Sequence, residues 1–190
     1  MKTTVIFAHP DVENGSIGNK IVLDALNDTT SVEVRELYKM YPNRIVDVEV
    51  EQQALLNTDV IVLQFPFYWF GVPSLLKEWM DTVLTHSFAY GPDADHLKGK
   101  QLLLSTTVGG REELYSATGA HLYAVEDYLK PFYRLASATG MIFLKPEISY
   151  GVSYNPTVEN RAERDRAANI ANEHACRLIE RIALEKTLAA

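Results

Sequence analysis

The sequence predicts an α/β fold built on a doubly wound, five-stranded parallel sheet with the strand order 2-1-3-4-5. Short apolar segments alternate with helical patterns five times along the chain. Apolar strands joined by crossover helices are typical of a parallel sheet that is covered on both faces. The length of 190 residues suits one ordinary domain, so we expect residues 1–190 to fold as a single unit.

Composition excludes several classes of protein. Hydrophobic residues make up 47% of the chain, and no apolar run approaches the ~20 residues that span a bilayer. The net charge of −7 argues against a nucleic-acid partner. Met1–Thr3 leads directly into a strand and leaves no room for a signal peptide, and Cys176 is the only cysteine. We therefore expect a cytoplasmic protein, and the scattered histidines predict no metal site.

The first part of the chain predicts two strands joined by a helix. Thr3–Ala8 is the first, and it is followed by a loop over His9–Asn19 that runs into a helix near Ser16 or Ile17. Ser31–Glu36 alternates like a second strand. The apolar stripe of the helix between them is Ile17, Ile21, Val22, Ala25 and Leu26.

The third strand is flanked by two helices. Leu37–Val50 is irregular in pattern, and Glu51–Asn57 predicts a short helix. The apolar run Val60–Leu63 predicts the buried third strand. A helix then runs from Pro73 to about Leu84, and one face of it carries Leu76, Trp79, Met80 and Val83.

The second half predicts two more strands. A long loop, His86–Lys98, precedes the strand Gln101–Thr106. A helix should begin near His121 and run to about Thr139, with a kink or break at Pro131. Met141–Tyr150 is the fifth strand, and Pro146 places it at an edge or bends it. A long helix from about Thr157 to Thr187 aligns Ile170, His174, Leu178 and Ile182, with His174 in a structural role.

Three loops are expected to form the ligand site. In doubly wound sheets, ligands bind beyond the carboxyl ends of the strands, near the switch in strand order. This rule points to the loops His9–Asn19, Pro66–Val72 and Thr107–His121. These loops are also the chemically unusual ones in the sequence, and this agreement favours a site at that edge.

The first loop suits a phosphate. Ser16, Gly18 and Asn19 stand at a helix N-terminus, where free N–H groups and the helix dipole favour an anion. An equally good interpretation is that Ser16 is an ordinary N-cap. The sequence contains neither G-x-G-x-x-G nor the P-loop motif, which argues against a Rossmann dinucleotide site and a P-loop nucleotide site.

The second loop suits a flat ligand. Four consecutive aromatic residues, Phe67, Tyr68, Trp69 and Phe70, lie between Pro66 and Gly71. Loops seldom concentrate aromatic side chains, so we expect them to hold a planar ring. A hydrophobic contact between two subunits is the alternative, since interfaces enrich the same residues.

The third loop combines small and polar residues. Thr106 and Thr107 precede Gly109 and Gly110, which would let the backbone approach a ligand closely. Tyr115 and His121 follow, and both are suitable donors for a group that gains electrons. An ordinary turn with two half-buried polar residues would explain the same pattern.

Taken together, these motifs resemble the flavin-dependent NAD(P)H:quinone oxidoreductases, the flavodoxin-like diaphorase family. The short bacterial branch, with its general-stress oxidoreductases and potassium-efflux ancillary proteins, is the most similar. The resemblance covers nearly the whole chain. It rests on Ala8–Pro10 with Ser16 and Asn19, Gln64–Gly71 running into Pro73–Trp79, Phe88–Gly91, Thr106 and Thr107 with Gly109 and Gly110, and Tyr115 with Gly119–His121. Val108 interrupts the family's usual Thr-Thr-Gly-Gly run.

The resemblance assigns each motif a role. The phosphate side of the flavin would contact His9, Ser16, Ile17, Gly18 and Asn19. The segment along the isoalloxazine would be Pro66, Phe67, Tyr68, Trp69 and Phe70, and the pyrimidine end would lie under Thr106, Thr107, Gly109 and Gly110. Tyr115 and His121 would stabilise charge during hydride transfer.

The resemblance also implies the reaction. NAD(P)H would reduce FMN, or alternatively FAD, and a quinone would then take two electrons in a ping-pong cycle. Family members are typically homodimers. The alternative is a regulatory flavoprotein bound peripherally to a membrane potassium-efflux protein, and a one-electron carrier is disfavoured because it needs no pair such as Tyr115 and His121.

Overall fold

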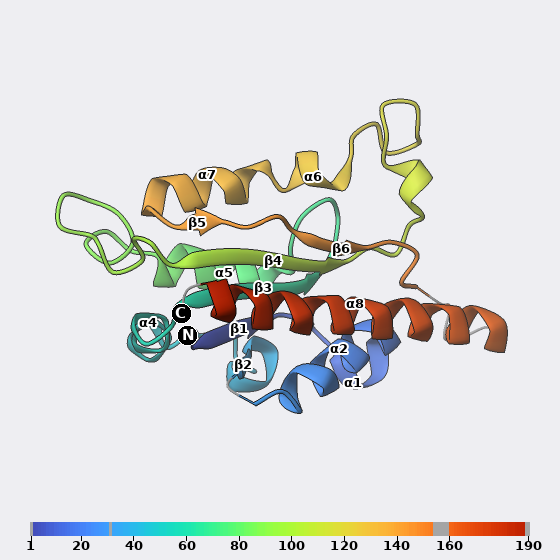
Figure 1. The fold of residues 1–190 in the computed structure, drawn as a ribbon, viewed down its shortest axis with the longest axis horizontal. Coiled ribbons are helices and arrows are strands. Elements are labelled where there is room, and N and C mark those ends of the chain that lie inside the picture. The colour runs from blue at the N-terminus through green and yellow to red at the C-terminus, as the bar shows by residue number, and fades with distance from the viewer. Residues whose placement is uncertain (1, 31, 154–159, 189–190) are drawn as a thin grey trace.

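The computed structural model describes residues 2–30, 32–153 and 160–188, and its centre is a parallel sheet (Figure 1). The strands follow the order β2-β1-β3-β4-β5, which confirms the predicted order 2-1-3-4-5, and β6 also pairs with β4. Their bounds are β1 (Thr3–Phe7), β2 (Val32–Glu36), β3 (Val60–Pro66), β4 (Gln101–Thr107), β5 (Ile142–Phe143) and β6 (Glu147–Ser149).

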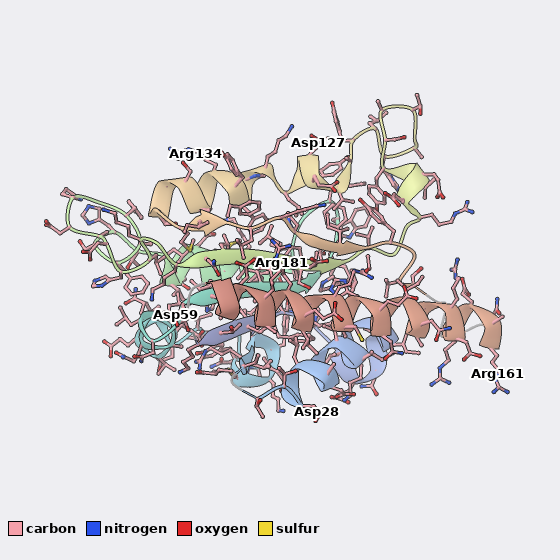
Figure 2. The ribbon with its side chains drawn as sticks, in the orientation of Figure 1. Asp28, Asp59, Asp127, Arg134, Arg161 and Arg181 are labelled. Atoms are coloured by element: carbon pink, nitrogen blue, oxygen red, sulfur yellow. The ribbon has the colours of Figure 1, made fainter. Side chains whose placement is uncertain are left out.

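Helices cover both faces of the sheet. They are α1 (Val12–Gly15), α2 (Ile17–Asn27), α3 (Leu37–Met40), α4 (Val48–Leu56), α5 (Ser74–Val83), α6 (Val125–Tyr128), α7 (Lys130–Thr139) and α8 (Arg161–Leu188), with a 3₁₀ turn, η1 (Glu112–Leu114). In Figure 1, α8 crosses in front of the sheet beside α2, and α6 and α7 lie along its upper side. Charged side chains such as Asp28, Arg134 and Arg161 point outward into solvent (Figure 2).

Two apolar cores result from this layering. Alternate residues of β3 point to opposite faces, so Val60 and Val62 join the core under α2 and α8, whereas Ile61 and Leu63 join the other core. The second core packs against α4, α5 and α7, with Trp79 almost fully buried. Burial of each strand on both faces explains why the strands read as continuous apolar runs in the sequence.

Several predicted boundaries shift for local reasons. The helix starts at Val48 and not at Glu51, because the Asp47 side chain accepts a hydrogen bond from the Val50 N–H and caps it. The helix expected to begin near His121 begins at Val125, so that prediction is wrong. The expected break near Pro131 separates α6 from α7, and Pro131 lies in the first turn of α7, where its missing N–H costs little.

The end of the sheet also differs in detail from the prediction. The segment around Pro146 divides the expected strand into β5 and β6, which both pair with β4. The short elements α1, α3 and η1 were not predicted. Residues 157–159 of the predicted last helix and Ser31 of the predicted second strand lie outside the described residues.

His174 on α8 attaches that helix to the sheet. Its Nε2 lies 2.7 Å from the Ser105 hydroxyl on β4, and its Nδ1 lies 2.9 Å from the Ser149 hydroxyl on β6. Burial, with a smaller contribution from Arg177, lowers the pKa of His174 to about 4, so the ring is neutral near pH 7. The contacts support the structural role expected for this residue.

A buried carboxylate holds the opposite layer together. Glu51 of α4 is fully buried, and Arg35 of β2 donates to it from Nε at 3.0 Å and from Nη2 at 2.6 Å. The Tyr41 hydroxyl donates at 2.6 Å and the Trp79 indole N–H at 2.9 Å. Four donors therefore satisfy one ion, which a buried charge requires if it is not to destabilise the fold.

Among the helices of the described residues, none is both long enough and apolar enough to cross a membrane.

Replacing Glu51 by alanine should lower the free energy of unfolding by about 3–5 kcal/mol, because it leaves the buried Arg35 guanidinium with only the partly exposed Glu33 as an ionic partner among the described residues. Urea denaturation measures this change. Glu49→Ala, at an exposed position of the same helix, is the matched control and should change stability by less than about 0.5 kcal/mol. Equal effects of the two substitutions would contradict the role of the cluster.

Candidate functional site

The loops that follow β1, β3 and β4 meet at one edge of the sheet and enclose a cavity of about 220 Å³. Ten of the residues predicted for the site line it, namely His9, Ser16, Ile17, Gly18, Asn19, Pro66, Phe67, Tyr68, Thr107 and Gly109. Three further lining residues, Gly15, Val152 and Ser153, were not predicted. The segment after β6 thus contributes to the site, and no composition signal in the sequence marks it.

The Asn19 side chain joins these loops from behind. Its Oδ1 accepts a hydrogen bond from Gln64 Nε2 on β3 at 3.1 Å. Its Nδ2 donates to Ser16 Oγ at 3.1 Å and to Thr107 Oγ1 on β4 at 3.0 Å. Asn19 is only 3% exposed, so its amide is shielded from solvent and its hydrogen bonds join α2, β3 and β4.

In this network the hydroxyl groups of Ser16 and Thr107 are both acceptors. Ser16 Oγ accepts from the Asn19 side chain and also from the Asn19 backbone N–H at 3.0 Å, as an N-cap does. Thr107 Oγ1 likewise accepts from Asn19. A hydroxyl that accepts from Asn19 keeps its own proton, so Ser16 and Thr107 can each donate to a ligand in the cavity that both residues line.

The donors fit an anion. The first-turn N–H groups of α2 have no partners within the helix, and the positive end of its dipole points the same way. No lysine or arginine is among the described residues that line the cavity. The N-cap interpretation of Ser16 and the phosphate interpretation are therefore compatible, since a hydroxyl that accepts from Asn19 can still donate its own proton to a ligand.

The third loop divides its residues between core and cavity. Thr106 is fully buried on the face opposite Thr107, and its hydroxyl has no hydrogen-bond partner among the described residues. The Val108 N–H donates to Ser149 O of β6 at 2.8 Å, so it is committed to the backbone pairing. Gly109, and not Val108, lines the cavity, and Gly110 lies against Tyr115.

The aromatic loop contains a strained turn. Tyr68 and Gly71 exchange backbone hydrogen bonds of 3.2 and 2.9 Å, and the two residues between them have positive φ, 49° for Trp69 and 62° for Phe70. A two-residue turn of this kind favours Asn-Gly, because bulky side chains disfavour the left-handed region. The turn separates the aromatic residues, leaving Phe67 and Tyr68 at the cavity and Trp69 94% exposed.

Tyr115 and His121 form a cluster beside the cavity. Their rings are 4.6 Å apart, and Tyr115 also lies 6.0 Å from Phe67, while His121 lies 5.5 Å from Phe70. Gly119 allows this turn, because a Cβ there would come within 2.4 Å of Leu114 O. Burial raises the pKa of Tyr115, so its hydroxyl remains a donor at neutral pH. Tyr128 and Tyr150, which the sequence did not single out, complete the cluster.

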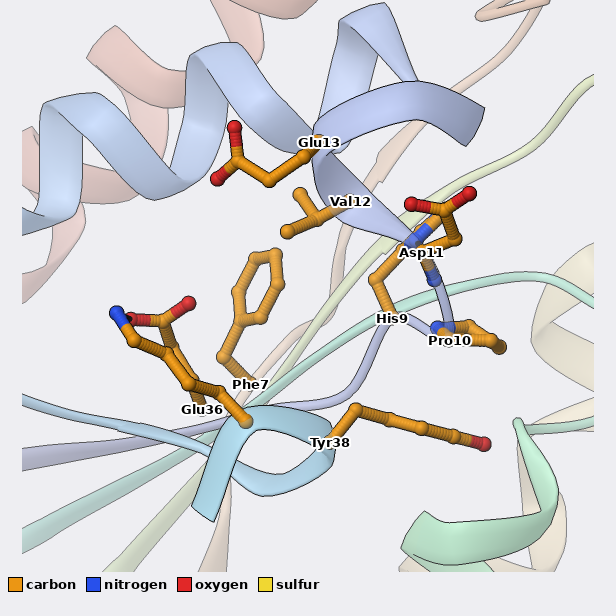
Figure 3. Close-up of a pocket in the computed structure, with 9 residues that line it drawn as sticks. Phe7, His9, Pro10, Asp11, Val12, Glu13, Glu36 and Tyr38 are labelled. Carbon is orange, nitrogen blue, oxygen red and sulfur yellow. Dashed lines mark hydrogen bonds and ion pairs between the residues drawn. The ribbon is translucent and has the colours of Figure 1, made fainter. Parts of the chain in front are cut away.

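Two other cavities adjoin this region. A groove of about 720 Å³ runs between α5 and α7, with Phe70 and Tyr128 among its lining residues. A cavity of about 270 Å³ lies on the other side of His9 and is lined by Asp11, Glu13, Glu36 and Tyr38 among others (Figure 3). Within the described residues, no group of three or more histidine, cysteine and acidic side chains is placed to bind a metal.

Comparison with known proteins identifies a matching family and similar sequences. The sequence profile of the Flavodoxin_2 family, described as a flavodoxin-like fold, matches residues 1–174. An uncharacterized NAD(P)H oxidoreductase of Bacillus subtilis, YrkL, is 43% identical over 166 residues, which are 86% of this chain and 95% of YrkL. The potassium-efflux ancillary protein KefG of Pectobacterium atrosepticum is 37% identical over 149 residues, covering 78% of this chain and 81% of KefG.

Solved structures with a similar fold include flavin and quinone proteins. The general stress protein 14 of Treponema denticola, in complex with FMN, has a TM-score of 0.83 and 34% identity, covering 94% of this chain and 98% of its own. An NADPH-quinone reductase of P. pentosaceus has a TM-score of 0.75 and 29% identity, covering 92% of this chain and 98% of its own.

Replacing Trp69 by asparagine should raise the free energy of unfolding of the protein without ligand by about 1 kcal/mol. Asparagine tolerates positive φ better than tryptophan, and the exposed ring contributes little burial. Urea denaturation measures the difference. Tyr133→Asn on α7 also removes an exposed aromatic ring, but from a helix, and should not stabilise the fold. A loss of stability in the Trp69 variant would contradict the strain.

Proposed function

We propose that this chain, which belongs to the flavodoxin-like family Flavodoxin_2, is an FMN-dependent NAD(P)H dehydrogenase that reduces quinones. The observation that carries the proposal is the cavity in which Ser16, Thr107 and the N-terminus of α2 present donors beside Phe67. The FMN complex of general stress protein 14 and the quinone reductase support the same cofactor and acceptor.

The residues at the cavity fit FMN. The phosphate would be held by the Ser16 and Thr107 hydroxyls and by the free N–H groups of Ile17 and Gly18. Phe67 and the backbone of Gly109 would flank the isoalloxazine. Each of these groups donates a proton or presents a flat apolar surface, as an anion joined to an aromatic ring requires.

When bound, FMN supplies the redox chemistry, accepting hydride from NAD(P)H and returning two electrons to a quinone in a separate step. The chain contributes orientation and charge stabilisation. Tyr115 is protonated at neutral pH, as tyrosine ordinarily is, and burial raises its pKa further, so it can donate to an oxygen that becomes negative. The ring of His121, whose centre lies 4.6 Å from the centre of the Tyr115 ring, would supply a second donor, an N–H group, beside it. This assignment makes Tyr115 and His121 the catalytic pair.

A second function is a regulatory one. The similarity to KefG favours a flavoprotein that associates with a membrane potassium-efflux protein. We also propose that the protein is a cytoplasmic homodimer, whichever of the two functions it has. The exposed side chains of Trp69 and Phe70 are suited to a contact between subunits. A one-electron carrier is less favoured, since a carrier has no use for the Tyr115–His121 pair.

Two measurements on the purified protein test the proposal. Mass spectrometry of the released cofactor should find FMN, and the reconstituted protein should oxidise NADPH rapidly with menadione. Bound FMN without turnover, together with copurification of a potassium-efflux protein, would support the regulatory function. Absence of FMN binding under reconstitution would overturn both functions.

The double substitution Tyr115→Phe and His121→Ala should reduce the turnover of menadione by about 100-fold or more and leave FMN bound. Steady-state kinetics and the flavin content of the same preparation check the two parts. Tyr133→Phe, which alters an exposed tyrosine of α7 whose ring packs against Phe143, is the control and should retain full turnover. Unchanged turnover in the double variant would remove the pair from the mechanism.

A further inference from the structure

On the basis of the proposed function, we propose that His9 is a positioning residue. It would fix the Tyr68 hydroxyl as a hydrogen-bond donor to the phosphate end of FMN. His9 comes directly after β1 and is 5% exposed. Both of its ring nitrogens have partners. These partners determine where the proton lies.

The backbone of Asp11 determines the tautomer. Its N–H donates to His9 Nδ1 at 3.2 Å, and an N–H can donate only to a nitrogen that carries no proton. The single proton of the neutral ring is therefore on Nε2. Burial lowers the pKa of His9 to about 4, against a smaller opposing effect of Asp11, so the neutral ring persists near pH 7.

The proton on Nε2 then determines the role of Tyr68. His9 Nε2 lies 3.2 Å from the Tyr68 hydroxyl oxygen, so His9 donates and Tyr68 accepts. The Tyr68 hydroxyl therefore cannot donate to Nε2, and its proton is free for another acceptor. Tyr68 lines the 220 Å³ cavity, and burial keeps the pKa of its hydroxyl above the ordinary value. It therefore becomes a third hydroxyl donor, beside Ser16 and Thr107.

The position of His9 indicates which end of the ligand Tyr68 reaches. The His9 ring lies close to Gly15, at the turn where α1 ends and α2 begins. That turn is the phosphate end of the cavity, because it carries Ser16 and the N-terminus of α2. His9 also forms part of the 270 Å³ cavity on its other side, where Figure 3 shows it beside Asp11 and Pro10.

This arrangement has a consequence for affinity. Because the described residues that line the cavity include no lysine or arginine, a bound dianion would rely on neutral donors, and each donor would carry a large share of the binding energy. Fixing the direction of a hydroxyl before the ligand arrives removes the cost of reorienting it. His9 and Tyr68 should therefore act as one unit, and their substitutions should not be additive.

A double-mutant cycle tests the proposal, with FMN and riboflavin as ligands of the protein freed of cofactor. Tyr68→Phe and His9→Leu should each weaken FMN binding by about tenfold or more. The double variant should lose no more than either single variant. Riboflavin, which lacks the phosphate, should bind all variants with nearly equal affinity. His9→Gln keeps an N–H donor and should restore most of the FMN affinity, and His96→Leu, at an exposed site, is the control.

The tautomer can be read independently of any variant. Nitrogen-15 NMR of the wild-type protein without cofactor should show the Nε2–H form of His9 at pH 7. An Nδ1–H form, additive losses in the cycle or equal losses for riboflavin and FMN would each overturn the proposal. Wild-type protein that binds FMN and reduces menadione but shows such a result retains the proposed function and loses only this role of His9. Wild-type protein that binds no FMN overturns both.

Discussion

The buried amide of Asn19 is the interaction on which the site depends. It connects the first turn of α2 to β3 through Gln64 and to β4 through Thr107, at the edge where three strands end. The amide oxygen accepts from Gln64, and the amide nitrogen donates to the hydroxyls of Ser16 and Thr107, so one buried side chain is held by three elements. The sheet order places β1, β3 and β4 side by side, and Asn19 joins α2 to two of these strands at the edge where the cavity lies.

Preorganisation extends from this amide to the aromatic loop. The same edge contains a turn in which two bulky residues have positive φ, and the structure tolerates this strain because the flanking residues exchange two backbone hydrogen bonds. The buried Glu51 cluster and the His174 contacts fix the layers on the two faces of the sheet. The rigid layers thus support a strained, polar edge, which is where function is expected in a fold of this kind.

The fold could be predicted because its signals are local and repeated. Apolar strands alternating with helical patterns leave few topologies, and the rule for parallel strands then brings residues as distant as Asn19 and Thr107 together. The start of a helix at Val125 was harder to predict from the sequence, because the turn at Gly119 that precedes it depends on close backbone contact with Leu114. Val152 and Ser153 were missed because the segment after β6 has no distinctive composition, and its approach to the cavity is purely tertiary.

Side-chain direction was the part that the sequence could not supply. Four neighbouring aromatic residues look equivalent in the sequence, yet the turn sends Trp69 into solvent and leaves Phe67 at the cavity. Likewise, Thr106 and Thr107 look like a pair, but the period of a strand places them on opposite faces. Hydrogen-bond direction depends on partners far along the chain, as in the contact of Tyr68 with His9.

A crystal structure of the FMN complex tests the central claim most directly. The account predicts the phosphate within hydrogen-bond distance of the Ser16 and Thr107 hydroxyls, with the isoalloxazine beside Phe67 and the Asn19 amide unchanged. A flavin seated in the groove between α5 and α7, or a phosphate away from the N-terminus of α2, would contradict it.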